Sequence, residues 1–330
     1  MTATGFDGIF IGNDGYAITN CTERIDFNPE SYGIKACMFS TANHQGYYCE
    51  YEIADGRLHL RSLYTYNAEG VYPPLNGVDP ILPKAWYDDA AWEDVRLPID
   101  YTGFLVLCDD SDENFLSEYY NHMGYQPVFM HKRAMGVAFE GGRVVGEFDL
   151  SPIVDHVRSM YDGEGESDEA WRIRRQCSWT LGFMRYASGP CRVAVDRYYE
   201  DRFKAEQAVL RRVIDGEPLC DSGRVLYGGY ELVPYAPAGL TPIEIRPERL
   251  AQLIEDVWLG RMGPDEIWAL TVVLRSCANG LEHFALKADQ EKLDDLCDEL
   301  AWATTEIEHG RPCLSPKLAQ SLRALASVVC

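Results

Sequence analysis

Residues 45–66 read Gln-Gly-Tyr-Tyr-Cys-Glu-Tyr-Glu-Ile-Ala, then Asp-Gly, then Arg-Leu-His-Leu-Arg-Ser-Leu-Tyr-Thr-Tyr. An Asp-Gly pair between two alternating runs is a strong β-hairpin signal, because a type I′ turn needs φ > 0 at both central residues. The alternation breaks between Leu60 and Leu63, because these two apolar residues are three positions apart and not two. We therefore predict an antiparallel hairpin over 45–66 with a bulge between these leucines.

The sequence around this hairpin carries further strand signals from about residue 4 to residue 150. A buried strand is expected over 101–108, and two more strands over 128–140 and 143–149 meet at a Glu-Gly-Gly turn. Residues 72–80 are too rich in Pro for a central strand. They form either a recognition loop or a loop that covers a sheet edge.

The back half changes to helical periodicity after an acidic, Gly-rich stretch at 162–169. A helix is expected before it, near 152–161. After it, helices are expected near 170–186, 191–215, 247–259, 264–279, 284–308 and 315–329. We predict an α+β fold: a mainly antiparallel β-sheet domain with a few helices over 1–162, followed by an α-helical domain over 170–330. Within the second domain, residues near 220–245 are expected to be irregular or a short hairpin.

The chain is strongly acidic, with 52 acidic and 30 basic side chains and a net charge of −22. Such a charge disfavours general binding to nucleic acids or anionic membranes and favours a basic partner. It is also common among bacterial cytosolic proteins. Neither a signal peptide nor an apolar run of membrane-spanning length is visible. Eleven scattered cysteines without a C-x-x-C pair indicate reduced thiols, as in the cytoplasm.

No phosphate-binding glycine loop, hydrolase elbow or metal-binding histidine pair occurs, so no metal and no cofactor is predicted. The acidic run 109–113 follows the buried strand over 101–108. It suits the N-terminus of a helix, where Asp and Ser cap open N–H groups. The alternative is a carboxylate- or metal-dependent enzyme, with His122 or His131 as general base.

Residues 171–212 carry ten basic and four acidic side chains. Spacings such as Arg192 to Asp196 and Glu200 to Lys204 favour a self-paired helix face. The remaining arginines could dock onto the acidic front half. A weaker alternative is a nucleic-acid-associated assembly, for which the candidate basic patch is Arg172, Arg174 and Arg175.

Thirteen of the twenty tyrosines precede residue 150. Tyr suits both strands and protein interfaces. Our leading hypothesis is a non-enzymatic interaction protein, such as an immunity-type inhibitor or accessory subunit, that binds a basic protein partner. The candidate partner-binding residues are Tyr64, Tyr66, Tyr72, Asp109, Asp110 and Asp112.

Overall fold

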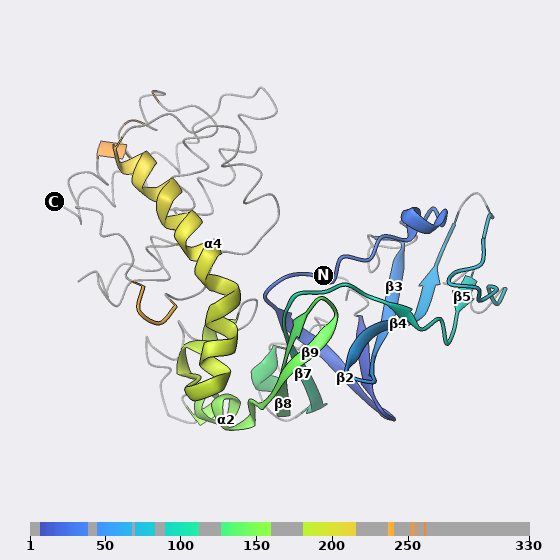
Figure 1. Cartoon of the computed structure of the whole chain (residues 1–330), viewed down its shortest axis with the longest axis horizontal. Helices are drawn as coiled ribbons and strands as arrows, with labels where there is room; N and C mark the ends of the chain where they lie inside the picture. The colour runs from blue at the N-terminus through green and yellow to red at the C-terminus, as the bar shows by residue number, and fades with distance from the viewer. Residues whose placement is uncertain are drawn as a thin grey trace, which may run out of the picture. The chain divides into compact units, whose positions relative to one another are not determined.

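The computed structural model describes residues 7–38, 45–67, 70–82, 90–111, 127–159, 181–215 and 237–240, and the single positions 252, 253, 256 and 261 (Figure 1). The chain divides into two compact units, Met1–Tyr198 and Tyr199–Cys330. The boundary predicted at 162–169 lies outside the described residues. The division into domains 1–162 and 170–330 therefore stays a prediction.

Seven strands of the first unit pair in a closed ring, in the order β3-β1-β2-β7-β8-β9-β4 and back to β3. The strands are β1 (Gly8–Ile11), β2 (Asp14–Cys21), β3 (Tyr47–Ala54), β4 (Arg57–Thr65), β7 (Gly103–Ser111), β8 (His131–Glu140) and β9 (Arg143–Asp149). All neighbours in the ring are antiparallel except β1 and β3. Closure of a sheet on itself removes most of its open edges. The described part of the first unit is therefore a closed, seven-stranded β-barrel.

The ring closes through a short contact between β4 and β9. Arg57 lies opposite Arg143, the Leu58 N–H donates to the Gly142 carbonyl, and the Val144 N–H donates to the Gly56 carbonyl. The rest of this edge of β4 pairs with two short strands outside the ring, β6 (Leu97–Pro98) and β5 (Ala90–Trp92). One edge of β4 therefore pairs in turn with β9, β6 and β5, and its contact with β9 is limited to a few residues.

Apolar side chains from every wall of the barrel fill its interior. The fully buried members include Ile9, Leu58, Leu60, Leu63, Leu105, Leu107, Val137 and Phe139. Within a strand they recur at every second position, as expected where alternate side chains face one side of a sheet, except across the bulge between Leu60 and Leu63. The alternating apolar residues in the sequence are therefore those that face the barrel interior, and the residues between them face the exterior.

A second apolar layer covers the outer face of β7, β8 and β9. The α2 helix (Ser151–Ser159) packs against β8, η2 (Val128–Met130) and η3 (Gly182–Tyr186). Phe104 stacks on Phe148 across this face, with ring centroids 6.0 Å apart. Gly136 lies beneath: a Cβ there would come within 2.3 Å of the Phe104 ring. A side chain at 136 would displace the stacked rings.

Both predicted hairpins are confirmed. Asp55 and Gly56 have φ of 51° and 68°, the positive values of a type I′ turn. The register of β3 and β4 shifts where Glu50 pairs with Ser62 and Tyr51 with Leu60, so the predicted bulge is present as well. The β8–β9 hairpin turns through Gly141 and Gly142, as the Glu-Gly-Gly sequence indicated.

The predicted fold class is wrong in its architecture. The described residues form a mostly β structure, a closed barrel with two α-helices, in place of an α+β sheet domain followed by a helical domain. Alternation of apolar residues predicts strands but not their closure, because closure depends on pairings such as β1 with β3 and β4 with β9. The helices predicted over 264–279, 284–308 and 315–329 and the segment 220–236 lie outside the described residues.

The second α-helix, α4 (Gly189–Asp215), matches the helix predicted over 191–215. Near its start, the Tyr198 hydroxyl donates to the Phe139 carbonyl of β8 (2.7 Å), and Arg197 forms an ion pair with Glu140. These contacts attach the first turns of the helix to the end of β8. None of the helices among the described residues has the length and apolarity needed to cross a membrane.

Candidate functional site at the open end of the barrel

A cavity of about 350 Å³ opens at the end of the barrel where β7 ends and β8 begins. Its walls come from β2, β7, β8, β9 and the first residue of α2. The lining includes Tyr16, Leu107, Arg133, Met135, Glu147 and Asp149. We call these six residues the barrel mouth.

The strand register sets the direction of the two acidic side chains of the mouth. Glu147 lies opposite Val137, and Asp149 lies opposite Met135, which in turn lies opposite Leu107. Side chains of directly opposed residues share one face of a sheet. Val137 and Leu107 belong to the barrel core, so Glu147 and Asp149 are on the interior face. Both are nevertheless exposed, and among the described strands only β8 pairs with β9 at this point.

The charges of the mouth are mainly negative. Asp109 lies opposite Arg133 in the β7–β8 ladder, on the same face, and the two form an ion pair. The Arg133 side chain is 68% exposed, so water screens this pair and it contributes little to stability. Glu147 and Asp149 add two carboxylates beyond it. Asp149 also accepts the Ser151 N–H (3.0 Å), which orients the start of α2.

The interpretation of the run 109–113 as a helix cap is wrong for its first members. Strand β7 continues to Ser111, so Asp109 and Asp110 are strand residues. The apolar run stops at Cys108, but the strand continues because β8 supplies partners as far as His131. Asp112 lies outside the described residues, as does His122. The enzyme hypothesis for 109–113 therefore stays a prediction.

The three candidate tyrosines lie at a distance from the mouth. Tyr64 is on β4, opposite Tyr48 at the start of β3, whereas the mouth lies near the end of β3. Tyr64 stacks on Tyr48 with centroids 4.6 Å apart, and its hydroxyl donates to Glu50. Tyr66 follows β4, and its carbonyl accepts the Cys37 N–H (3.0 Å). The structure does not bring Asp109 and the tyrosines together.

Tyr72 belongs to the Pro-rich loop, which packs on the edge of the sheet beside β5. Its ring lies 6.1 Å from that of Trp92, and the Trp92 indole N–H donates to the Pro73 carbonyl (3.1 Å). Leu75 of the loop is fully buried, and the Asn76 side chain donates to the Val95 carbonyl (2.8 Å). These contacts support the covering role that the sequence left open for residues 72–80.

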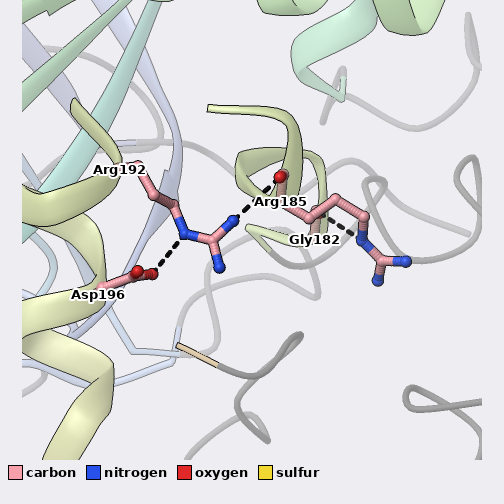
Figure 2. A network of polar contacts seen from close by, with 4 residues as sticks. All are labelled: Gly182, Arg185, Arg192 and Asp196. Atoms are coloured by element: carbon pink, nitrogen blue, oxygen red, sulfur yellow. Dashed lines mark hydrogen bonds and ion pairs between the residues drawn. The ribbon is translucent and has the colours of Figure 1, made fainter. Parts of the chain in front are cut away.

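Two arginines of the Arg-rich segment 171–212 are hydrogen-bonded within the chain. Figure 2 shows Arg192 donating to Asp196 on α4 (2.7 Å) and to the Arg185 carbonyl of η3 (2.9 Å). The Arg185 side chain in turn donates to the Gly182 carbonyl (3.1 Å). The predicted pairing of Arg192 with Asp196 is thus confirmed. Arg172, Arg174 and Arg175 lie outside the described residues, so their role stays a prediction.

A cluster of buried titratable groups lies at the other end of the barrel. Asp7 accepts the Cys49 N–H (2.8 Å), and the Tyr51 hydroxyl is hydrogen-bonded to the Cys49 thiol. Burial raises the pKa of the Asp7 carboxyl, and burial followed by the charge of Asp7 raises the pKa of Cys49 well above its usual value. A thiol held protonated in this way is a poor nucleophile.

No group of His, Cys, Asp and Glu side chains suited to a metal ion occurs within the described ranges. Comparison of the chain with protein families, with curated proteins and with solved structures finds no match. The barrel mouth is therefore interpreted from its own geometry.

Sequence reasoning missed Glu147 and Asp149 as site residues. Both lie in the correctly predicted strand 143–149, where alternating acids indicate a solvent face. The bulge that places Val145 between Val144 and Gly146 reverses the phase of the strand. That reversal turns the acids from the outer face to the interior face. In the sequence, this bulge is signalled only by the break in the alternation of apolar and polar residues between Val144 and Glu147.

Proposed function

We propose that this protein is a non-enzymatic interaction protein, such as an immunity-type inhibitor or accessory subunit, that binds a basic protein partner. The binding site is the barrel mouth. The observation that carries the proposal is the open cavity of about 350 Å³ whose exposed wall presents Glu147 and Asp149. A cationic side chain of a partner would enter between these carboxylates and pack its apolar stem on Tyr16 and Met135, which are partly exposed.

The charge of the surrounding chain supports the choice of a basic partner. Residues 1–162 contain 25 acidic and 10 basic side chains, a net charge of −15. A surface of one sign accelerates the encounter with a partner of opposite sign and gives the association a strong salt dependence. The described cysteines Cys21, Cys37, Cys49, Cys108 and Cys191 form no disulfide bond. This supports a reducing compartment, and we place the protein in the cytoplasm.

The test is affinity capture from an extract of the native host, with mass spectrometry of the bound proteins. The full chain is immobilised as wild type, as Glu147→Gln with Asp149→Asn, and as Glu30→Gln with Asp79→Asn. The third protein is a matched control, because it loses the same two charges from exposed positions outside the mouth. Asn at position 149 retains the oxygen that accepts the Ser151 N–H.

We expect a stoichiometric basic protein on the wild type and on the control, and its loss from the mouth variant. Recovery should fall as salt is raised to about 0.5 M, where screening acts over roughly 4–5 Å. Equal recovery of that protein on all three baits would refute the mouth as the binding site. Absence of any basic protein would refute the proposed function.

A further inference from the structure

Among the described residues, no strand pairs with the edge of β9 that faces away from β8 along the mouth. Its last bond on this side joins the Val144 N–H to the Gly56 carbonyl (2.9 Å), at the tip of the β3–β4 hairpin. Arg57 is the first residue of β4, so no β4 residue lies beside β9 beyond that point, and within the described residues the rest of β9 pairs only with β8. Residues Val145–Asp149 therefore form an edge strand.

The hydrogen bond of Leu150, the residue after β9, shows which backbone groups of β9 face away from β8. The Leu150 N–H donates to the Ala134 carbonyl of β8 (2.8 Å). Backbone groups alternate between the two sides of a strand, so the N–H and C=O of Glu147 and Asp149 point away from β8. Two residues thus present both a donor and an acceptor, in the spacing that an additional strand requires.

The side chains of the edge select the kind of strand. An added strand would place alternate side chains beside Glu147 and Asp149, on the interior face of the barrel and next to the cavity. Lys or Arg at these positions would pair with the two carboxylates. A second copy of this chain is disfavoured, because pairing of one β9 with another brings like charges together.

We propose that an extended segment of the basic partner adds to β9 along Val145–Asp149 as a further strand, with Lys or Arg at every second position facing Glu147 and Asp149. This inference rests on the proposed function and specifies how the partner is recognised. Main-chain hydrogen bonds to the edge provide affinity, and the carboxylates of the mouth provide selectivity. The added strand would continue the barrel wall beside Val145–Asp149, beyond the tip of the β3–β4 hairpin.

The first test uses a capped synthetic peptide of alternating Lys and Thr, about seven residues long to match the edge. Backbone amide exchange of the full chain is followed by NMR as the peptide is titrated. We expect the N–H groups of Glu147 and Asp149 to become protected, while that of Phe148, which faces β8, changes little. Binding without protection of Glu147 and Asp149 would overturn strand addition.

The second test compares two forms of the peptide that are methylated on backbone nitrogens. One carries a methyl group on the backbone nitrogen of every Lys, and the other on the backbone nitrogen of every Thr. Only one set of N–H groups can face β9 in a strand whose Lys side chains face the mouth. We therefore expect one isomer to bind at least about tenfold more weakly than the parent and the other to bind within about twofold, measured by fluorescence anisotropy. Equal affinities of the two isomers would overturn strand addition and leave capture through the charged mouth standing.

Two variants at position 147 distinguish the contribution of the backbone N–H to peptide binding from that of the carboxylate. Glu147→Gln removes a carboxylate and keeps the N–H, whereas Glu147→Pro also removes the N–H on the open edge without removing a bond to β8. We expect weaker peptide binding by E147P than by E147Q. Equal binding by two variants that both melt cooperatively would count against the inference. If E147P does not fold, the N-methylated peptides still decide.

Discussion

At the scale of single residues, Asp7 shows how burial makes stability depend on pH. Burial raises the pKa of its carboxyl, against smaller opposing effects of the Cys49 N–H and the charge of Arg24. A raised pKa in the folded state means that the folded state binds the proton more tightly than the unfolded state does. The stabilisation is therefore fully present below the unfolded pKa of 3.8 and is lost as the pH rises through the raised value.

We expect Asp7→Asn to remove this contribution. The free energy of unfolding of the variant should fall less than that of the wild type between about pH 4 and about pH 8, because Asn keeps an acceptor for the Cys49 N–H without a titrating charge. Urea denaturation at each pH measures the difference. Asp26→Asn, at an exposed acid, is the control and should follow the wild type. Parallel pH curves for wild type and Asp7→Asn would contradict the assignment.

At the scale of elements, the packing of β7 on β8 depends on the absence of a side chain at position 136. Gly136→Ala would place a Cβ 2.3 Å from the Phe104 ring, which Phe148 holds by stacking. We expect a loss of about 1–3 kcal/mol in unfolding free energy. Gly8→Ala is the matched control, since its Cβ in β1 meets only the Tyr16 carbonyl, at 3.8 Å. Addition of Phe104→Leu should restore part of the loss, and equal effects at both glycines would refute the packing argument.

The α4 helix offers two ion pairs of the same i,i+4 spacing in different surroundings. Arg192 and Asp196 have side chains that are 19% and 12% exposed, whereas Lys204 and Glu200 are each 52% exposed. Partial burial reduces screening, and Arg192 also bonds the Arg185 carbonyl (Figure 2). We expect a double-mutant cycle to Ala to give a coupling energy of about 1 kcal/mol for Arg192 and Asp196.

The cycle on Lys204 and Glu200 is the control, and its coupling should be clearly smaller because both side chains are more exposed to water than those of Arg192 and Asp196. Thermal or urea unfolding of the four proteins in each cycle provides the energies. Equal couplings in the two cycles would show that burial does not distinguish the pairs.

At the scale of the whole molecule, closure of the barrel depends on the turn between β8 and β9. Gly142 has φ of 73°, and a Cβ there would come within 2.1 Å of the Ile99 carbonyl, a backbone atom that cannot rotate away. Gly141 has φ of 54° and would meet only the Asp100 side chain, at 3.6 Å. Both glycines therefore have a backbone conformation that is strained for other residues, but only Gly141 has room for a Cβ.

We expect Gly141→Ala to cost about 1–2 kcal/mol, from the left-handed conformation alone. Gly142→Ala should cost about 2 kcal/mol more, because its Cβ also pushes the turn away from Ile99, which is hydrogen-bonded to Leu58 of β4. Urea denaturation measures both, and amide exchange at Leu58 and Val144, whose N–H groups bridge the two strands, reports the opening of the ring. Equal costs at 141 and 142 would mean that the turn does not control closure.

The sequence by itself determined the local structure of the barrel. Asp55-Gly56 and Gly141-Gly142 define two hairpins because few residue types accept positive φ, and the spacing of Leu60 and Leu63 revealed a bulge. The strand over 143–149 and the helix over 191–215 were also predictable, because their patterns are formed by neighbouring residues.

Only the tertiary structure decided the architecture and the site. The parallel pairing of β1 with β3 and the contact of Arg57 with Arg143 join residues far apart in the chain, and no local pattern encodes such pairings. The same contact ends at the β3–β4 turn, which leaves the edge of β9 open. Glu147 and Asp149 became site residues for that reason: a one-residue bulge turned them inward at the place where the wall stops.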